Sequence, residues 1–382
     1  MLVSHPTALS RRAFLRKSGF ALGFVRLAPG LVGAAAPDVE VSDLRVISRQ
    51  PEFYHGWPTL TRRRNGQLMV VYSGGRESHV CPFGRVECIR SNDDGESWTW
   101  PRVLFDGPID DRDAGILETS QGSLLVTSFS SLAYEDVSKG KDDPAWQAVN
   151  ARMSAHERKA QLNQWILRSE DGGVSWSPPV PSLVNSPHGP IELSDGQLLY
   201  PGKELWTGDR RVGAARSTDD GRSWQWLARI PTREGDNEAE YHELHGVQAP
   251  SGRVIVHIRN HNPSDRGETL QTESTDGGVT WSMPHSIGVW GLPSFLMRLR
   301  DGRLLMTYGY RRIPFGNRAR ISTDEGRTWS SEMGVSSDGA SGDLGYPSTV
   351  ELKDGSLLSV WYERLSDNPH AVLRQARWRI KM

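Results

Sequence analysis

The chain has 382 residues, and its 45 Lys and Arg nearly balance its 46 Asp and Glu, which gives a formal net charge of −1 at pH 7. This length allows one large domain or two ordinary ones. A balanced charge provides no basic surface for nucleic acid or an anionic membrane, so we expect neither as a partner. With only two cysteines, Cys81 and Cys88, the chain is not a disulfide scaffold. The two could pair in an oxidising compartment, but Cys88 falls inside an expected strand, which argues against a disulfide.

An export signal is predicted at the start of the chain. Paired arginines, Arg11 and Arg12, precede a modest apolar stretch and small residues that end at Ala36. This pattern is typical of a twin-arginine signal, whereas a basic amphipathic N-terminus is the alternative. Charged residues and a proline interrupt the short apolar run, so we expect no stable membrane anchor. The sequence therefore predicts an export signal over 1–36, a single domain over 37–382, and a periplasmic or secreted location.

A turn residue followed by Gly, a variable residue and an apolar run is repeated along the chain. The six copies read NGQLMVVY from 65, QGSLLVTS from 121, DGQLLYPG from 195, SGRVIVHI from 251, DGRLLMTY from 301 and DGSLLSVW from 354. Such a Gly turn between two short apolar runs predicts a β-hairpin. Recurrence at a spacing of 50 to 74 residues predicts six similar structural units.

A second motif, Ser-x-Asp-x-Gly-x-Ser/Thr-Trp, follows five of these hairpins. It reads SNDDGESW from 91, SEDGGVSW from 169, STDDGRSW from 217, STDGGVTW from 274 and STDEGRTW from 322. We expect each box to join a third strand to a fourth, with the Asp accepting backbone N–H groups, the Gly at positive φ and the Trp packed on the sheet. One Asp per turn supplies too few ligands for Ca²⁺, so we interpret the box as a structural staple.

Six units of four strands predict an all-β fold, a six-bladed β-propeller of four-stranded antiparallel blades. The last unit has no box, because the chain ends after its third strand, 371–380. We expect 44–49 to supply the fourth strand of this blade and so to close the ring.

An insertion over 131–164 lengthens the second blade. Asp143 and Pro144 have the order of a helix N-cap and first helical residue. Trp146, Val149 and Met153 would share one face of that helix. We expect a helix lying on the propeller, with its apolar face packed; bordering a site is the alternative.

Blade topology places a functional site at one end of the central axis. The Gly turns and boxes occupy one end of every blade, so the start of each first strand and the end of each second strand meet at the other end. Nine residues before the Gly of each turn stand Trp57, Asp113, Pro187, Glu243, Pro293 and Tyr346. The second strands end near Arg76, Lys203, Arg259 and Arg311. A purely structural propeller has no need for carboxylates, a phenol and cations at this mouth, so we predict that the mouth is the site.

These features resemble the sialidase (neuraminidase) superfamily over roughly residues 40–382. The segment ELHGVQAPSGRVIVHIRN is similar to the blade-four segment of that family, and the resemblance assigns the family's Glu and Arg to Glu243 and Arg259. The segment GYPSTVELKDGSLLSVWYE is similar to the family's blade-six segment, which carries a nucleophilic Tyr, here Tyr346. In the family the same segment ends in Tyr-Glu, as at Tyr362-Glu363.

The resemblance implies an exo-acting glycoside hydrolase that releases a terminal acidic sugar, most simply sialic acid, from a glycan and needs no cofactor. A sialic acid carries a carboxylate on its anomeric carbon, which would repel a carboxylate nucleophile but not a phenol deprotonated by Glu. Arginines would bind that carboxylate. The alternatives are that Tyr346 packs between blades and that Arg259 forms a structural ion pair.

The chain departs from the family at two positions of blade one. The family's Arg-Ile-Pro motif is replaced by HGWP, so no arginine stands at position 56, and no Asp follows Arg76 in GGRESHVCPFGR. We predict Asp113 as the proton donor, with His79 and Glu77 as alternatives. The residues expected to bind substrate are Arg259, Arg311, Arg76, Arg112, His188, Lys203 and Trp57.

Two further interpretations remain open. The His residues show no metal-ligand spacing such as HExxH, so no metal site is predicted. The lost arginine leaves a non-catalytic or differently reacting carbohydrate-binding propeller, or a hydrolase for another acidic sugar such as a uronic acid, as alternatives to a sialidase.

Overall fold

The computed structural model describes residues 38–138, 142–206, 208–264 and 266–381. The predicted export signal, 1–36, lies outside the described residues. Among the described residues, no helix combines the length and the apolar character needed to cross a membrane.

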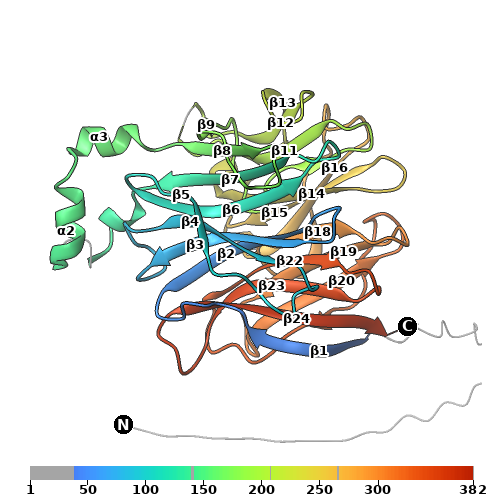
Figure 1. Ribbon diagram of the computed structural model, residues 1–382. Helices are drawn as coiled ribbons and strands as arrows, with labels where there is room; N and C mark the ends of the chain where they lie inside the picture. The colour runs from blue at the N-terminus through green and yellow to red at the C-terminus, as the bar shows by residue number, and fades with distance from the viewer. Residues whose placement is uncertain (1–37, 139–141, 207, 265, 382) are drawn as a thin grey trace, which may run out of the picture. The chain divides into compact units, whose positions relative to one another are not determined.

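Six four-stranded antiparallel sheets form the predicted propeller (Figure 1). Blade 1 consists of β2 (Tyr54–Arg62), β3 (Leu68–Arg76), β4 (Arg85–Ser91) and β5 (Arg102–Phe105). Blade 2 consists of β6 (Asp110–Glu118), β7 (Leu124–Ser131), β8 (Gln164–Ser169) and β9 (Val180–Pro181). Blade 3 consists of β10 (Ile191–Glu192), β11 (Leu198–Lys203), β12 (Val212–Ser217) and β13 (Gln225–Arg229).

The remaining blades follow the same plan. Blade 4 consists of β14 (Tyr241–Gln248), β15 (Val254–Asn260), β16 (Glu268–Ser274) and β17 (His285–Trp290). Blade 5 consists of β18 (Ser294–Arg298), β19 (Leu304–Tyr310), β20 (Gly316–Ser322) and β21 (Met333–Gly334). First strands of neighbouring blades contact one another, as β2 does with β6 and with β22, so these strands surround the axis.

The N-terminal strand closes the ring, as predicted. Blade 6 consists of β22 (Leu344–Glu351), β23 (Leu357–Arg364), β24 (Ala371–Lys381) and β1 (Asp38–Val46). β1 pairs antiparallel with β24 from Asp38↔Lys381 to Val46↔Arg374. The pairing therefore begins six residues earlier than the predicted 44–49. The prediction missed this first part because most of β1 is solvent-exposed and its apolar alternation is interrupted at the register shift between Val41 and Asp43.

The five boxes are turn staples, as predicted. In each box the Ser hydroxyl donates to the Asp carboxylate two residues later and accepts the N–H of the Gly four residues later, at 2.7–2.9 Å. The same carboxylate accepts the N–H and hydroxyl of the following Ser or Thr, as Asp93 does from Ser97. These hydrogen bonds lower the pKa of Asp93 to about 2.

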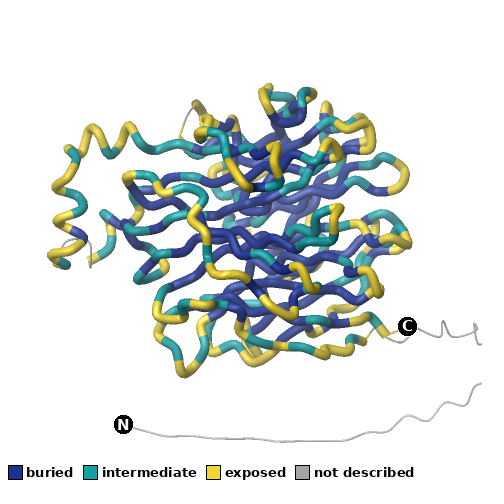
Figure 2. Tube along the Cα trace, in the orientation of Figure 1, coloured by how far each residue is buried: buried dark blue, intermediate teal, exposed yellow. Residues whose placement is uncertain are grey.

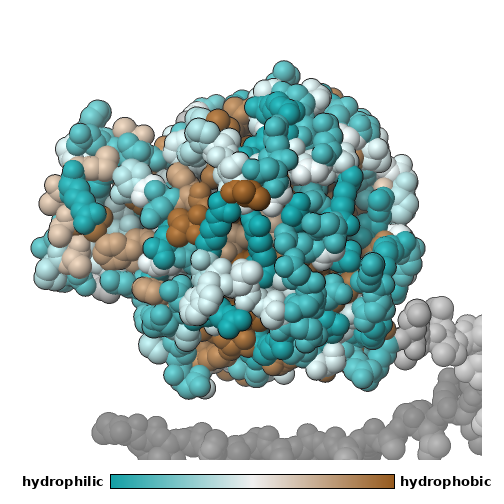
Figure 3. All heavy atoms as spheres, viewed as in Figure 1, coloured by the Kyte–Doolittle hydropathy of each residue, from teal (hydrophilic) through white to brown (hydrophobic). Residues whose placement is uncertain are grey.

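Apolar side chains between neighbouring blades form the core. Leu60 and Val70 of blade 1 pack with Val350 and Leu358 of blade 6, and similar clusters join the other blades. The strands are accordingly buried and the connecting turns exposed (Figure 2). The face drawn in Figure 3 is mostly hydrophilic, with hydrophobic atoms in small separate patches. Both cysteines are buried free thiols.

Within the described part of the insertion after β7, two short α-helices, α2 (Pro144–Asn150) and α3 (Ala155–Ala160), project beside the propeller in Figure 1. The prediction of a single helix was wrong, because α2 ends at Asn150 and Ser154 starts α3 with a capping box. Asp143 caps α2, as predicted, by accepting the N–H groups of Ala145 and Trp146. Trp146 is fully buried in a small cluster against the propeller.

Candidate active site

A shared backbone irregularity turns four side chains toward one another at the mouth. Trp57, Asp113, Glu243 and Tyr346 have φ values of 52°, 54°, 45° and 55°. Each lies at a register shift between the first and second strands of its blade. A non-glycine residue in this region costs about 1–3 kcal/mol, a strain that proteins retain mainly at functional sites. The equivalent positions of blades 3 and 5 hold Pro187 and Pro293, whose rings exclude positive φ.

Tyr346, Glu243 and Arg259 form one hydrogen-bonded group. The Tyr346 hydroxyl donates to one carboxylate oxygen of Glu243, and Arg259 Nη1 donates to the other. The same Nη1 lies 3.3 Å from the Tyr346 hydroxyl. Blades 4 and 6 therefore contribute a phenol, its acceptor and a cation that contacts both.

The electrostatics of this group fix where its protons reside. Burial, together with the Glu243 charge, raises the pKa of Tyr346 well above its usual value. Burial would also raise the pKa of Glu243, but the adjacent Arg259 outweighs it and lowers that pKa to about 2. At neutral pH the phenol is therefore protonated and hydrogen-bonded to an ionised carboxylate.

Asp113 has the opposite electrostatic character. Its side chain is buried, and Oδ1 has no hydrogen-bond partner among the described residues. Burial raises the pKa of Asp113 to about 7, with Arg112 opposing the shift and Glu243 adding to it. The Arg112 contact is loose, with 3.8 Å between Arg112 Nε and Asp113 Oδ1. Asp113 is thus a carboxyl group that holds its proton up to neutral pH.

Two further arginines lie near these carboxylates. Arg311 donates through Nε to the carbonyl of Leu344 at 3.0 Å, and its charge acts on both Glu243 and Tyr346. The Arg112 guanidinium stacks over Trp57, with 4.3 Å from its carbon to the ring centroid. Trp57 also contacts Tyr346, with ring centroids 6.4 Å apart. Arg259, Arg311, Arg112 and Trp57 therefore lie around the carboxylates, while their expected role in binding substrate stays a prediction.

Arg76 occupies a different environment from the one expected. It is fully buried, and both of its Nη atoms donate to the carboxylate of Asp110. Arg76 also donates to the backbone carbonyl of His79 at 3.0 Å. Arg76 therefore donates its hydrogen bonds to other groups of the protein, and through the His79 carbonyl it holds the loop that follows β3.

That loop carries His79 into a network that sequence reasoning missed. His79 Nδ1 lies 3.1 Å from Asp343 Oδ1 and 2.9 Å from the Tyr54 hydroxyl, which itself donates to Asp343. Burial lowers the pKa of His79 despite the Asp343 hydrogen bond, so the imidazole is neutral at pH 7. Tyr54 and Asp343 each stand three residues before a bulge residue, Trp57 and Tyr346. That offset is the signal that could have revealed them.

The other expected residues lie apart from the Tyr346 group or contact only its edge. Glu77 accepts the indole N–H of Trp146 at 3.0 Å and so ties the insertion to blade 1. Lys203 donates its ammonium to backbone carbonyls at the start of β14. His188 is buried, with its ring centroid 6.2 Å from that of Tyr346, and burial lowers its pKa to about 3.

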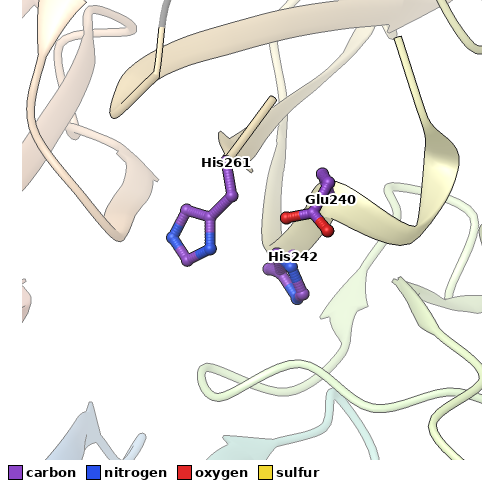
Figure 4. A group of neighbouring side chains, drawn as sticks. All are labelled: Glu240, His242 and His261. Carbon is purple, nitrogen blue, oxygen red and sulfur yellow. The ribbon is translucent and has the colours of Figure 1, made fainter. Parts of the chain in front are cut away.

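A second polar cluster adjoins Arg259. Glu240, His242 and His261 each offer a ligand atom within 4.8 Å of the others (Figure 4). Arg259 Nε is 2.8 Å from His261 Nε2, to which it donates. Burial lowers the pKa of His242 to about 3 and also lowers that of His261, so both imidazoles are neutral at pH 7. No spacing in the sequence indicates this cluster, since the pairing of β14 with β15 assembles it.

A six-bladed propeller stapled by five Asp boxes, with Tyr, Glu and Arg at its mouth, is the architecture of the sialidase superfamily. The family of BNR repeat-like domains matches residues 139–359, more than half of the chain. The chain therefore belongs to that family. A sialidase of Bacteroides fragilis (strain YCH46) is 25% identical over 340 residues, which cover 80% of this chain and 59% of the relative. The chain thus spans less than two thirds of that relative.

Solved structures share the fold. A protein of unknown function from Dyadobacter fermentans DSM 18053 superimposes with a TM-score of 0.74 at 22% identity, covering 90% of this chain and 99% of the other. A Trypanosoma rangeli sialidase, in complex with 2,3-difluorosialic acid as a covalent intermediate, gives 0.61 at 16% identity, with coverages of 89% and 59%. An intramolecular trans-sialidase from Ruminococcus gnavus gives 0.61 at 14% identity, with coverages of 89% and 96%.

Proposed function

We propose that the protein is a sialidase-type exo-glycoside hydrolase in which Tyr346 is the nucleophile. The observation that carries this proposal is the hydrogen bond from the Tyr346 hydroxyl to Glu243, with Arg259 in contact with both. The name of the Bacteroides fragilis relative supports the same reaction class. The Trypanosoma rangeli sialidase, which forms a covalent intermediate with 2,3-difluorosialic acid, supports a covalent mechanism.

The first step forms a bond between the Tyr346 oxygen and the anomeric carbon. Glu243 takes the phenolic proton as that bond forms, and the glycosidic bond breaks with its electron pair on the leaving oxygen. In the free enzyme Arg259 makes Glu243 a weak base. A substrate carboxylate that shares Arg259 would weaken this effect, so the pKa of Glu243 would rise as the substrate binds. Binding would therefore activate the base that the nucleophile needs.

Asp113 is the proposed general acid. It protonates the leaving oxygen in the first step and, once ionised, accepts a proton from the water that releases the sugar from Tyr346. Its pKa of about 7, which burial raises, suits both roles near neutral pH. Neutral His79 is a poorer proton donor, and Glu77 is held by Trp146.

Arg259, Arg311 and Arg112 are the proposed binding groups for the sugar carboxylate. Gly56 supplies no side-chain cation, and Arg76 is committed to Asp110. This altered set of cations favours one second candidate, a hydrolase for another acidic sugar such as a uronic acid. Both candidates use the same Tyr346 chemistry and differ only in the sugar.

A panel of fluorogenic sialosides, uronides and neutral glycosides tests the proposal. We expect turnover of an acidic glycoside and none of neutral ones, because the arginines around Glu243 require an anionic partner. Sialoside turnover would select the sialidase, and uronide turnover the second candidate. Binding of an acidic sugar without turnover of any substrate would contradict the hydrolase and favour a carbohydrate-binding propeller.

We further propose that the protein is exported by the twin-arginine route, on the basis of Arg11 and Arg12 and the residues up to Ala36. Substituting both arginines by lysine should leave the protein in the cytoplasmic fraction of a host with this pathway. Unchanged export of that variant would contradict the proposal.

A further inference from the structure

We propose that Glu240, His242 and His261 form a binding site for one divalent transition-metal ion, with Zn²⁺ as the reference ion. Figure 4 shows the three side chains gathered at one end of blade 4, and their nearest ligand atoms lie within 4.8 Å of one another. The two imidazole rings are 4.8 Å apart at their centroids. The proposal concerns metal binding and goes beyond the hydrolase function.

The backbone of blade 4 fixes the positions of these three residues. Glu240 ends a short 3-10 turn, Glu238–Glu240, and β14 begins at the next residue. The His261 N–H donates to the Glu240 carbonyl at 2.9 Å, directly beyond the strand pair Tyr241↔Asn260. The adjacent pair is His242↔Arg259. His242 thus lies in β14, and Glu240 and His261 directly adjoin the paired ends of β14 and β15 and are joined by a backbone hydrogen bond, which limits the entropy lost when an ion binds.

The donor set suits a transition metal. Two imidazole nitrogens and one carboxylate oxygen are a common three-ligand set for Zn²⁺ and leave a fourth position for water. Imidazole nitrogens select such ions over Mg²⁺ or Ca²⁺, which prefer oxygen ligands. All three side chains are partly exposed, so an ion has access to them. An approach of up to about 1.5 Å between the ligand atoms would bring them to the spacing of about 3.3 Å that a tetrahedral ion requires.

Neighbouring charges set the expected strength of binding. Lys203 acts on His242, while Arg259 and Arg266 act on His261, and these three cations oppose metal binding. The Lys203 ammonium is occupied by the carbonyls of Ala239 and Tyr241. The Glu240 and Glu243 carboxylates favour a cation. We therefore expect saturable binding that is weaker than at a structural zinc site.

The site is linked to the Tyr346 group through Arg259. Arg259 Nε donates to His261 Nε2, so that nitrogen provides the lone pair and Nδ1 carries the proton of the neutral ring. An ion bound at Nε2 would displace Arg259. An ion bound at Nδ1 would require the ring proton to move to Nε2, where it would face the N–H of Arg259 Nε. Metal binding at His261 and the Arg259 hydrogen bond are therefore mutually exclusive. Bound metal should release Arg259 from its present position beside Glu243.

Calorimetric titration of the chelator-treated full chain with Zn²⁺ tests the site without any substrate. We expect one equivalent to bind. Glu240→Gln and His242→Ala should each weaken binding by about tenfold or more, since each removes one of three ligands. His285→Ala is the matched control, because His285 is an exposed histidine of the same blade beside a single carboxylate, Glu273. Binding in this control should equal that of the unaltered protein.

Three results would overturn the proposal. They are no saturable binding up to about 1 mM Zn²⁺, unchanged affinity in both Glu240→Gln and His242→Ala, and an equal loss in His285→Ala. The conservative Glu240→Gln variant keeps the side-chain volume, so its loss of affinity cannot be assigned to unfolding when its melting temperature is unchanged. A separate measurement tests the competition between the metal ion and Arg259 for His261. Arg259→Gln should bind Zn²⁺ more tightly, because the competing N–H donor and positive charge are gone. Weaker binding in Arg259→Gln would disprove the link.

Discussion

Asp113 and Glu243 occupy equivalent bulge positions of blades 2 and 4, with φ values of 54° and 45°, yet their carboxyl groups have opposite protonation states near neutral pH. Burial raises the pKa of Asp113 to about 7, whereas Arg259 overcomes burial and lowers that of Glu243 to about 2. Two carboxyl groups whose pKa values are driven apart are the arrangement expected for an acid and a base. Tyr346, hydrogen-bonded to Glu243, stands at the equivalent position of blade 6.

Asp113→Asn should affect substrates according to their leaving groups. A natural glycoside needs its alcohol protonated, so kcat should fall by about 10²–10⁴-fold on such a substrate. An activated aryl glycoside leaves without a proton and should lose far less. Steady-state kinetics on the two substrates measure the difference. Equal losses on both would make Asp113 a structural or binding residue and redirect the search to His79.

The pH profile should report the same group. The proposed mechanism requires protonated Asp113 and ionised Glu243, so kcat/KM for a natural glycoside should fall as pH rises above about 7. Asp113→Asn should abolish this basic limb.

The stability of the fold should follow the same titration. The folded pKa of Asp113 is raised above the usual 3.8, so its contribution to stability is full below pH 3.8 and is lost as pH rises through about 7. Asp113→Asn should therefore raise the melting temperature more at pH 8.5 than at pH 5.5. If the melting temperatures of Asp113→Asn and the unaltered protein differed by the same amount at both pH values, the raised pKa of Asp113 would be contradicted.

Arg259→Ala should mainly weaken substrate binding. Loss of an arginine that anchors a buried carboxylate costs on the order of 2–4 kcal/mol, which should raise KM by about 30-fold or more. A loss of kcat is also expected, because Glu243 would lose its counter-ion and burial would then raise its pKa. Arg300→Ala is the control. Arg300 forms an ion pair with Glu351 in the neighbouring blade, and its side chain is more exposed than that of Arg259. Similar KM changes in both variants would exclude a specific anchoring role.

Removal of β1 should destabilise the whole propeller. β1 covers the edge of β24, so a chain beginning at residue 48 would expose an unpaired strand. We expect its melting temperature to be lower by several degrees or more than that of a chain beginning at residue 38. Differential scanning calorimetry of the two truncated chains makes the comparison. Identical melting temperatures would show that ring closure contributes nothing to stability.

The fold was largely predictable because its signals are local. Each Gly turn and each box fixes a strand connection within eight residues, as in the segment from Ser91 to Trp98. The boundaries of β1 were less predictable, since an edge strand gains its order from β24 and not from its own pattern. The restart of the helix at Ser154 was visible as Ser-x-x-Glu, but the apolar spacing across it favoured one continuous helix.

The site was only partly predictable because its contacts join different blades. Counting back from each Gly found Asp113, Glu243 and Tyr346, since one bulge recurs in their blades. No pattern in one strand shows that Arg76 would meet Asp110 of the next blade. The offset of Asp343 from Tyr346 could have located it, but its partners in the His79 network come from blade 1 and leave no mark in its own strand.

The most direct measurement of the central claim is mass spectrometry of a trapped intermediate. The protein is incubated with a derivative of the acidic sugar that the fluorogenic panel selects. This derivative carries one fluorine on the anomeric carbon as the leaving group and a second on the adjacent carbon, where fluorine slows release of the covalent intermediate. Proteolysis should then yield the peptide that contains Tyr346 with the mass of the fluorosugar added. The Tyr346→Phe variant should bind the sugar but show neither labelling nor turnover. Labelling of another residue, or wild-type turnover by Tyr346→Phe, would contradict the account.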